Sequence, residues 1–526
     1  MFNVFRKIYL NSFLYDKKIS KNFNSNLKYK PSTHLIFSIL KSQSKKLNID
    51  DFTLESVWNN TNLEIKQIDR LNNFFWLFSL DLKSSNTTVQ SVIKNWFEIN
   101  SRYNAKSWEF ITTSKRIISW LSNSKLTYNE STDQYKKRFN FIIQKQAFHL
   151  IYQLDKIKNY DEKLIGIASI ILVGLCFDDE KNFITKGLDQ LKKTIKSSMS
   201  NYGFPKSRSI KQSVFFLKYL ILIREWFKES QIEIPELINE NIYYLGQSYA
   251  FFWKNINTDP LFNGNNISDN KEFDQYLKRL GYSFKNDNFD LSGYVSLNNK
   301  KINLFMDAGP SPTKKFSNNY QAGALSIEFS SNGHKIFTNP GIYQNKNLKL
   351  KKLSRSSSLH NTLTIDDNSS CKFNLKNGNY QIINGLNITK KDIIYEKDYW
   401  KIVSAHDGFL KKFNLIYERE IEYFPEKFKL IGNEKIIGKK NLPNLKFDIR
   451  FHLNPQAKIM KTQDNKSILI EIGDEGWKFS SENYEIEIDN GLFFGKKNSY
   501  IENQNIFITG ITYSQINNIK WELSKI

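Results

Sequence analysis

The segment RSSSLHNTLTID brings together three side chains that could act on an anionic substrate: Arg355, His360 and Asn361. A guanidinium can neutralise a carboxylate, and imidazole is the side chain whose unperturbed pKa lies closest to neutrality, which suits it to proton transfer. The alternative is structural. In that interpretation the segment packs where a loop enters a strand, and Arg355 and His360 form hydrogen bonds with loop carbonyls.

Three further histidines have interpretations that involve no chemistry. His452 alternates with apolar neighbours in RFHLNP, which is typical of a satisfied histidine on a strand. His406 precedes an Asp-Gly turn, where a local side-chain hydrogen bond explains it. His334 follows an Asn-Gly pair and is expected to be exposed.

The elements that position such residues fall into two kinds along the chain. From about residue 27 to 254 apolar residues recur at helical spacing. In WEFITTSKRIISWLSN they lie on about one side of the helix, with Trp108 and Trp120 among them. These two rings are spaced for a helix interior, although inner-face aromatics of a helical toroid can also stack on sugar rings. Successive helices of this kind predict stacked helical hairpins, arranged as an (α/α) toroid.

A change in composition marks the predicted boundary at residues 255–288, which are rich in Asn, Asp and Gly. Alternating strand patterns fill residues 289–526. Asn332-Gly333 lies between two of them and favours a tight hairpin, because both positions of such a turn need positive φ. This part of the chain is therefore expected to form a large antiparallel β-sandwich.

The charge of the chain points to a polyanionic partner without identifying it. The formal net charge is +23, carried mainly by Lys spread over the whole length of 526 residues. A diffuse positive field attracts nucleic acid, anionic membranes and acidic sugar chains alike. Base composition of the genome explains the Lys excess equally well. Nucleic-acid binding has only net charge behind it, since no recognised motif is present.

The remaining sequence signals exclude several classes. Cys176 and Cys371 lie far apart and predict no disulfide framework. The longest apolar stretch, Leu164–Phe177, is too short for a membrane span and predicts a buried helix. Residues 1–26 are predicted to be a basic extension; they lack an uninterrupted apolar core and a cleavage site, so a standard secretory signal is not expected. No Gly-rich phosphate loop and no metal-binding motif occurs.

The most specific segments resemble a known family. DAGPSP, YQAGALSIEFSSNGHKIFTNPGIY and RSSSLHNTLTIDDNSSCKF, in this order, resemble the C-terminal domain of the heparinase II/III-like polysaccharide lyases. The likeness continues through HDGF, LIYEREIEY and FDIRFHLNP to EGWKFS, and the helical segments, GFPKSRS included, resemble the family's N-terminal domain. The resemblance implies a helical toroid followed by a β-sandwich, with a carbohydrate cleft between them.

The same resemblance implies a β-eliminating mechanism on uronate polymers. Such a lyase neutralises the substrate carboxylate, removes the C5 proton with a base and protonates the leaving oxygen with an acid. The helical-domain Asn or His of the family corresponds to Asp161 to Lys163, where neither type occurs. The Tyr-His pair corresponds to Lys211 and Gln212, and the sandwich His to Gln321. A lysine beside an arginine could supply the base, so Lys211 is a candidate.

The family's structural metal is not expected here, because its three ligand positions are Gly323, Asn339 and His360, of which one can ligate as a histidine. The predicted catalytic positions are therefore Lys211, Gln212, Gln321 and His360. Arg355, Asn361, Trp108 and Trp120 are the predicted substrate-binding residues. No cofactor is expected.

The resemblance, together with these substitutions, leaves two functions open. The first is a lyase of an acidic polysaccharide, either a glycosaminoglycan, alginate or an envelope polymer. The second is a binding protein that retains the cleft without the chemistry. The resemblance implies the cell envelope or periplasm, whereas the doubtful signal sequence favours the cytoplasm. The sequence does not predict the oligomeric state.

Overall fold

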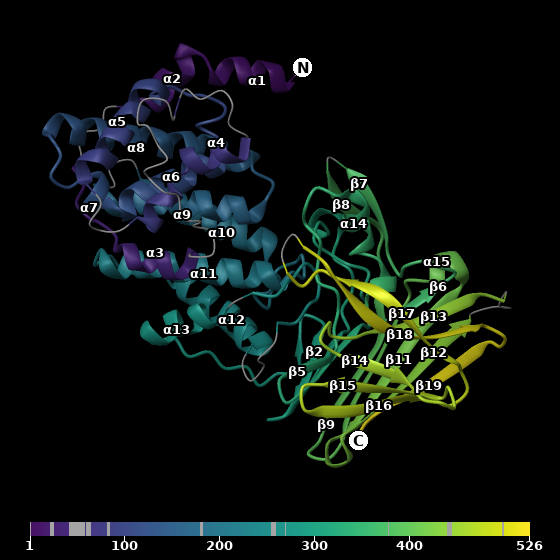
Figure 1. Cartoon of the computed structure of the whole chain (residues 1–526). Helices are drawn as coiled ribbons and strands as arrows, with labels where there is room; N and C mark the ends of the chain where they lie inside the picture. Colours follow the sequence, from purple (N-terminus) through teal and green to yellow (C-terminus); the bar gives the residue numbers. More distant parts are fainter. Residues whose placement is uncertain are drawn as a thin grey trace. The chain divides into compact units, whose positions relative to one another are not determined.

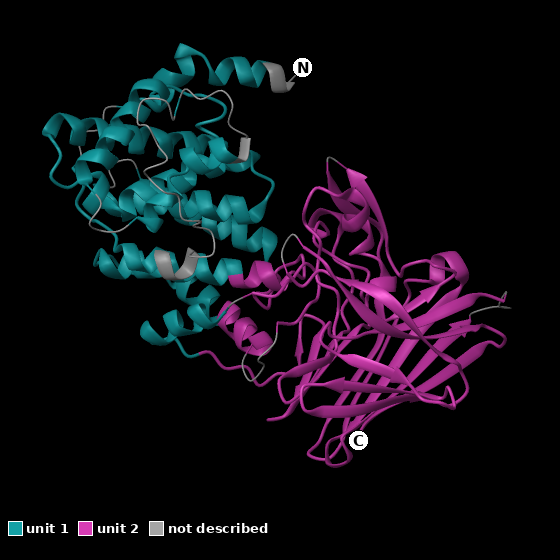
Figure 2. Cartoon of the chain, in the orientation of Figure 1, with its two compact units in different colours: residues 1–199, 215–243, 269–283 teal, residues 200–214, 244–268, 284–526 magenta. Residues whose placement is uncertain are grey.

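The computed structural model describes residues 2–21, 26–40, 58, 65–80, 85–178, 182–253, 259–268, 270–376, 378–438, 444–496 and 499–526. It divides into two compact units, shown in Figure 2. Unit 1 comprises residues 1–199, 215–243 and 269–283, and unit 2 comprises residues 200–214, 244–268 and 284–526. The units interleave along the chain, whereas the composition of the sequence indicates one boundary at residues 255–288.

Unit 1 is helical (Figure 1). The predicted helices WEFITTSKRIISWLSN, RFNFIIQKQAFHLIYQL, LIGIASIILVGLCF and VFFLKYLILIREWF are confirmed as parts of α6, α8, α9 and α11. Two helices, α11 and α12, have residues in both units. The helices in the described residues are α1 (Phe2–Leu10), α2 (Phe13–Ile19), α3 (Thr33–Leu40), α4 (Ile65–Asn72), α5 (Asn86–Asn100), α6 (Phe110–Ser122), α7 (Ser124–Thr127), α8 (Asp133–Gln153), α9 (Tyr160–Cys176), α10 (Phe183–Ser198), α11 (Ile210–Glu229), α12 (Glu236–Trp253) and α13 (Lys271–Arg279), with 3₁₀ turns η3 (Phe75–Ser79) and η4 (Leu154–Lys156).

Capping side chains and apolar faces explain where these helices form. The Thr132 hydroxyl accepts a hydrogen bond from the Tyr135 amide at the start of α8, and the Asn159 side chain accepts one from the Asp161 amide at the start of α9. In α9 every residue from Leu164 to Cys176 is buried, as its all-round apolar sequence predicts. Among the described residues, none of the helices combines the length and the apolar character of a membrane span.

Unit 2 consists mainly of antiparallel sheets. In its described residues a five-stranded sheet has the order β1-β2-β3-β4-β5, an eight-stranded sheet the order β14-β15-β16-β19-β12-β11-β10-β9, and a four-stranded sheet the order β17-β18-β13-β6, while β7 and β8 form a separate hairpin. The predicted antiparallel β half is confirmed. The strands are β1 (Asp290–Leu291), β2 (Tyr294–Asn298), β3 (Ile302–Asp307), β4 (Ile327–Ser331), β5 (His334–Phe337), β6 (Leu363–Ile365), β7 (Lys372–Lys376), β8 (Asn379–Asn384), β9 (Ile388–Tyr395), β10 (Trp400–His406), β11 (Leu415–Phe424), β12 (Lys429–Gly438), β13 (Lys446–His452), β14 (Lys458–Lys461), β15 (Ser467–Ile472), β16 (Glu475–Ser481), β17 (Ile486–Phe493), β18 (Ile501–Ile511) and β19 (Ile516–Lys525).

Short helices connect the strands of unit 2. These are η5 (Lys314–Phe316), α14 (Leu348–Leu353), η6 (Ser357–Leu359), α15 (Leu410–Phe413) and η7 (Pro425–Lys427). The hairpin predicted at Asn332-Gly333 is confirmed: it joins β4 to β5, Ser331 pairs with His334, and the two turn residues have φ of 45° and 82°. His334 is exposed, as predicted.

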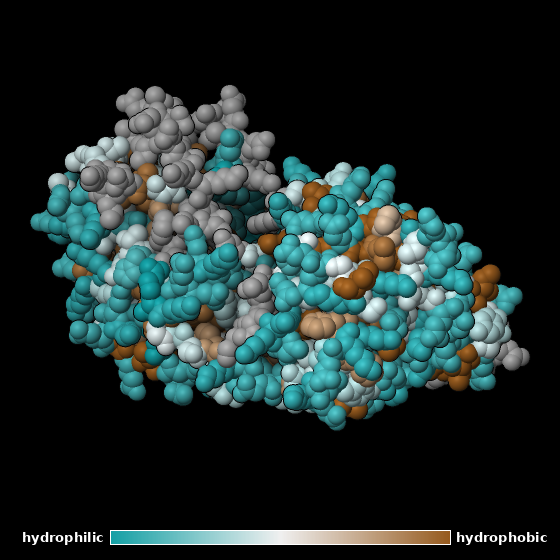
Figure 3. Space-filling model, turned by 60° about the horizontal axis from the view of Figure 1, so that its bottom comes forward, coloured by the Kyte–Doolittle hydropathy of each residue, from teal (hydrophilic) through white to brown (hydrophobic). Residues whose placement is uncertain are grey.

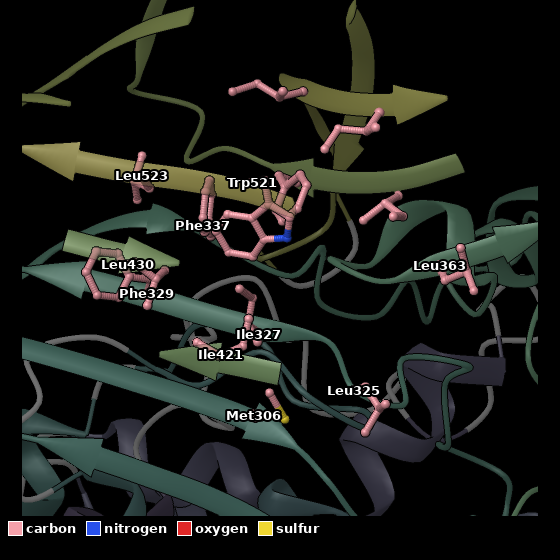
Figure 4. Packing of buried hydrophobic residues seen from close by; sticks show 14 of the residues in the cluster. Met306, Leu325, Ile327, Phe329, Phe337, Leu363, Ile421, Leu430, Trp521 and Leu523 are labelled. Carbon is pink, nitrogen blue, oxygen red and sulfur yellow. The ribbon is translucent and has the colours of Figure 1, made fainter. Parts of the chain in front are cut away.

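Aromatic side chains from several sheets share one core in unit 2. Phe337 of β5 meets Trp521 of β19 edge to face, with ring centroids 6.2 Å apart, and Phe451 of β13 lies 4.7 Å from Trp521. Figure 4 shows Phe337 beside Trp521 with aliphatic residues around them. Strands of three sheets therefore bury their inward faces against one another, which is the packing of a β-sandwich.

Candidate functional site

A buried ion pair in unit 2 joins the segments GFPKSRS and DAGPSP. Nη2 of Arg208 donates to Oδ1 of Asp307, the last residue of β3, at 2.7 Å. The second carboxylate oxygen of Asp307 accepts a hydrogen bond from the side-chain amide of Asn263 at 2.8 Å. The Arg208 guanidinium also lies over the Tyr294 ring, 4.5 Å from its centroid. This network fixes residues 200–214 on the five-stranded sheet.

The charge balance inside the network keeps the guanidinium protonated. Burial alone would lower the pKa of Arg208, but the Asp307 carboxylate and the neighbouring phenols outweigh it, and the pKa lies above its ordinary value. The Tyr294 hydroxyl donates to the Arg208 carbonyl at 2.6 Å, and burial raises the pKa of that phenol. The guanidinium also donates to the carbonyls of Ser292, Gly309 and Pro310, and such additional hydrogen bonds are the condition under which a buried pair is tolerated.

The anchored segment carries two of the predicted catalytic residues. Lys211 and Gln212 lie in the first turn of α11, where Lys211 is exposed and Gln212 is half-buried. The Gln212 side-chain oxygen accepts from the Ser207 hydroxyl at 2.7 Å. Tyr202, near the start of the same segment, is 76% exposed. On this segment the exposed ammonium group of Lys211 can contact the carboxylate of a sugar.

Gln321 is fully buried, and its amide joins three backbone segments. Its oxygen accepts from the Gly264 amide at 3.0 Å, and its nitrogen donates to the carbonyls of Gly341 at 2.9 Å and Ser354 at 2.6 Å. Both hydrogens of the Gln321 side-chain amide therefore donate to backbone carbonyls. In this conformation the Gln321 side chain holds loops together and has no hydrogen left for a substrate carboxylate.

His360 is buried as well, and burial lowers its pKa from 6.5 to about 4. Its Nδ1 lies 2.8 Å from the Ser356 carbonyl, which can only accept, so Nδ1 carries the proton of the neutral ring. Asn361 is equally embedded: its amide nitrogen donates to the Ile327 carbonyl at 2.7 Å and its oxygen accepts from the His452 amide. Both residues therefore support the loop before β6.

The three family metal positions lie close together but do not fit a metal. A Cβ on Gly323 would lie 2.7 Å from Cδ2 of His360, so glycine leaves the ring room and supplies no ligand. The Asn339 side-chain oxygen already accepts from the Asn361 amide. Within the described residues, no group of three or more His, Cys, Asp or Glu could hold a metal ion. Of these three positions, His360 alone therefore has a side chain of a type that commonly binds a metal ion.

Arg355 forms hydrogen bonds with loop carbonyls, as the structural interpretation of its segment predicts. Nη1 donates to the Lys351 carbonyl at 2.8 Å and Nη2 to the Asn318 carbonyl at 2.9 Å. Its guanidinium lies over the Tyr380 ring, 5.2 Å from the centroid, and burial lowers its pKa to about 10. Arg355 therefore ties α14 to η5 and to the β7–β8 hairpin, and it remains charged at neutral pH.

The two predicted stacking tryptophans belong to the core of unit 1. Trp120 is fully buried and meets Trp96 edge to face with centroids 5.3 Å apart. Trp108 is buried and donates from its indole nitrogen to the Asn100 carbonyl at 2.8 Å. Neither ring has an exposed face in this conformation. The helix-interior interpretation of their spacing accounts for both positions.

A basic surface forms on unit 2 around α14 and the β7–β8 hairpin, which Figure 1 shows grouped together. The Tyr380 hydroxyl of β8 donates to the Leu348 carbonyl of α14 at 3.2 Å, and the Ile382 amide of β8 donates to the Ser317 hydroxyl beside η5 at 2.9 Å. The segments 308–327, 338–365 and 368–391 that build this surface contain no Asp or Glu. We call its exposed lysines the basic face: Lys314, Lys315, Lys346, Lys349, Lys352, Lys372 and Lys376.

The basic face and the Arg208 network are the features that the sequence analysis missed. The signal for the first was available in the sequence, because the segments that carry its lysines contain no Asp or Glu. For the second, GFPKSRS and DAGPSP were recognised as segments of the family, but nothing in either indicates that Arg208 pairs with Asp307. Figure 3 shows that hydrophilic residues cover most of the visible face.

The architecture, a helical unit and an antiparallel β unit, defines a class of helical-toroid and β-sandwich proteins. Within this class the predicted resemblance is confirmed: residues 284–522 match the family model described as heparinase II/III-like, C-terminal. No curated protein sequence matches the chain.

Solved structures share the fold over nearly the whole chain. A mutant of the heparan sulfate lyase HepC from Pedobacter heparinus matches with a TM-score of 0.72 and 13% sequence identity, covering 98% of this chain and 87% of that one. A heparinase III structure matches with a TM-score of 0.69 and 14% identity, covering 97% of this chain and 88% of that one. The toroid and β-sandwich architecture is therefore shared with these enzymes.

Proposed function

We propose that this protein acts on a uronate-containing acidic polysaccharide and cleaves it by β-elimination. The observation that carries the proposal is the basic face, an exposed group of lysines on a heparinase II/III-like domain, built from segments without acidic residues. Ammonium groups spaced along a surface bind a polymer that carries a carboxylate or sulfate on successive sugars. The fold shared with heparan sulfate lyase and heparinase III supports the same class of substrate.

The chemistry of the proposal centres on Lys211. β-Elimination needs a group that neutralises the substrate carboxylate, a base for the C5 proton and an acid for the leaving oxygen. Of the four predicted catalytic positions, Lys211 and Gln212 are accessible, while Gln321 and His360 are buried. Lys211 is proposed either to neutralise the carboxylate as the ammonium ion, or to take the C5 proton as the neutral amine and then donate a proton to the leaving oxygen, with Gln212 as an amide donor beside it. A location in the cell envelope or periplasm belongs to this proposal.

A second candidate function is binding of the same polymer without cleavage. The burial of His360 favours it, because a neutral imidazole that donates to the Ser356 carbonyl cannot approach a sugar in this conformation. The fully engaged amide of Gln321 favours it too. Cleavage requires either chemistry carried by Lys211 and its neighbours or a different arrangement around His360.

The test incubates the purified full chain with heparan sulfate, chondroitin sulfate, alginate and host capsule polymers and follows the ultraviolet absorbance of the unsaturated uronate product. A rising signal on one polymer, lost in Lys211→Met and kept in Lys458→Met at an exposed position of β14, supports the lyase proposal. A flat signal together with measurable binding supports the second candidate. Cleavage that is unchanged in Lys211→Met rules out the proposed role of the lysine.

A further inference from the structure

The N-terminal helices α1 and α2 are anchored on α8 by polar contacts, in α1 through Arg6, whose guanidinium donates to the Gln153 side-chain oxygen. The Tyr15 hydroxyl lies 2.8 Å from Nδ1 of His149 and accepts from the Gln153 amide at 3.2 Å. Asp16 pairs with Lys145 at 2.8 Å. Tyr15 and Ile19 are buried. The segment predicted as a basic extension is therefore part of unit 1, with a fixed inner face.

Four large apolar side chains of the same two helices are open to solvent. Phe5 is 66% exposed, Ile8 62%, and Phe13 and Leu14 are each 71% exposed. Scattered exposed apolar residues are ordinary, but large side chains gathered on one short segment mark an interaction surface. We call this group the apolar tip: Phe5, Ile8, Phe13 and Leu14.

Exposed lysines lie on the same segment as the apolar tip. Lys7, Lys17 and Lys21 are exposed, and Nζ of Lys18 lies over the Tyr152 ring, 4.4 Å from its centroid. Asp16 is the one acidic residue of positions 1–21, and it is paired with Lys145. Positions 1–21 thus combine exposed large apolar side chains with exposed ammonium groups.

We propose that α1 and α2 bind the surface of an anionic lipid bilayer. The apolar tip enters the boundary between headgroups and acyl chains, while the lysines of the same segment contact lipid phosphates. A symmetric contact between two copies of the chain would bring the same lysines together, so charge disfavours a second copy as the occupant. This inference is independent of the proposed polysaccharide substrate and gives the protein a place at a membrane surface.

Vesicle co-sedimentation of the full chain tests the proposal. The vesicles are phosphatidylcholine alone, or phosphatidylcholine with about one third phosphatidylglycerol. The wild type is expected to bind the anionic vesicles more strongly, and Phe13→Ser with Leu14→Ser weakens this binding by roughly tenfold or more. Lys17→Glu with Lys18→Glu removes the preference for anionic vesicles. The matched control is Met460→Ser with Tyr513→Ser, exposed apolar positions of unit 2, which leaves binding unchanged.

Two results would overturn the proposal. One is a wild type that binds neither kind of vesicle. The other is equal vesicle binding by the wild type and the Phe13→Ser, Leu14→Ser variant. Light scattering of the same samples identifies the alternative occupant: a dimer that dissociates in this variant, without vesicle binding by the wild type, would assign the apolar tip to a second copy of the chain. Both substituted positions are exposed, so the variant is expected to keep the wild-type circular dichroism spectrum.

Discussion

Arg208 and Asp307 form a buried ion pair at 2.7 Å although 99 positions separate them in the sequence. Asp307 ends a strand of the β unit, and Arg208 precedes α11, a helix that continues into unit 1. This pair helps to hold residues 200–214, which carry Lys211 and Gln212, in the β unit. The accessible candidates for catalysis are consequently held by the domain that matches the heparinase II/III-like family.

Replacing Arg208 by Met is expected to lower the free energy of unfolding by about 3 kcal/mol or more, because it leaves the Asp307 carboxylate buried without its partner. The measurement is urea denaturation followed by tryptophan fluorescence. Lys458→Met, which breaks the exposed pair of Lys458 with Glu471, is the control and should cost under about 1 kcal/mol. Equal losses in the two variants would show that the Arg208 pair does not anchor the segment.

Gly323→Ala is expected to destabilise the protein by about 1 to 3 kcal/mol, since the new Cβ would lie 2.7 Å from the His360 ring. Gly476→Ala is the matched control, because its nearest neighbour would be Cβ of Ile526 at 3.9 Å. In a His360→Ala background the imidazole ring is absent, so Gly323→Ala should destabilise the protein less. Thermal unfolding of the four variants measures this; an unchanged cost in that background would contradict the packing.

Stability is expected to fall as the pH drops, because His360 is buried in its neutral form. Its folded-state pKa of about 4 lies below the ordinary 6.5, so between these values the unfolded chain binds the extra proton. The stabilisation from this histidine is complete above about pH 6.5 and is lost as the pH approaches 4. Burial also lowers the pKa of His406 to about 4, which adds to the trend.

His360→Gln isolates this contribution. The difference in unfolding free energy between wild type and variant should shrink by about 2 kcal/mol between pH 7 and about pH 4.5. His334→Gln, at an exposed position, controls for removal of an imidazole. Urea denaturation across this pH range gives the values. A difference that stays constant with pH would mean that His360 is accessible and titrates in the native protein.

Much of the fold could be predicted from the sequence because it depends on local patterns. The all-round apolar run in α9 requires a buried helix, and Asn332-Gly333 supplies the two positive φ angles of a tight turn. The interleaving of the two units could not be predicted in this way. It depends on contacts such as that of Arg208 with Asp307, which no local pattern encodes.

The candidate site was less predictable for the same reason. His360 and Gln321 have residue types suited to chemistry, yet their burial follows from neighbours that come from distant segments, such as Gly264 and Gly341 around Gln321. The basic face likewise forms only when α14, η5 and β7 meet. Along the sequence its lysines are separated by neutral stretches and look like part of a diffuse charge.

Binding of heparan sulfate at several salt concentrations tests the account most directly. One triple variant, Lys346→Glu, Lys349→Glu, Lys352→Glu, reverses the charge of three exposed lysines of the basic face. The control triple variant, Lys300→Glu, Lys458→Glu, Lys466→Glu, changes the net charge by the same amount at exposed positions elsewhere on unit 2. The account predicts that the first variant binds roughly tenfold or more weakly with a reduced salt dependence, while the second stays near wild type. Equal losses in both variants, or no loss in the first, would contradict a polysaccharide site on the basic face.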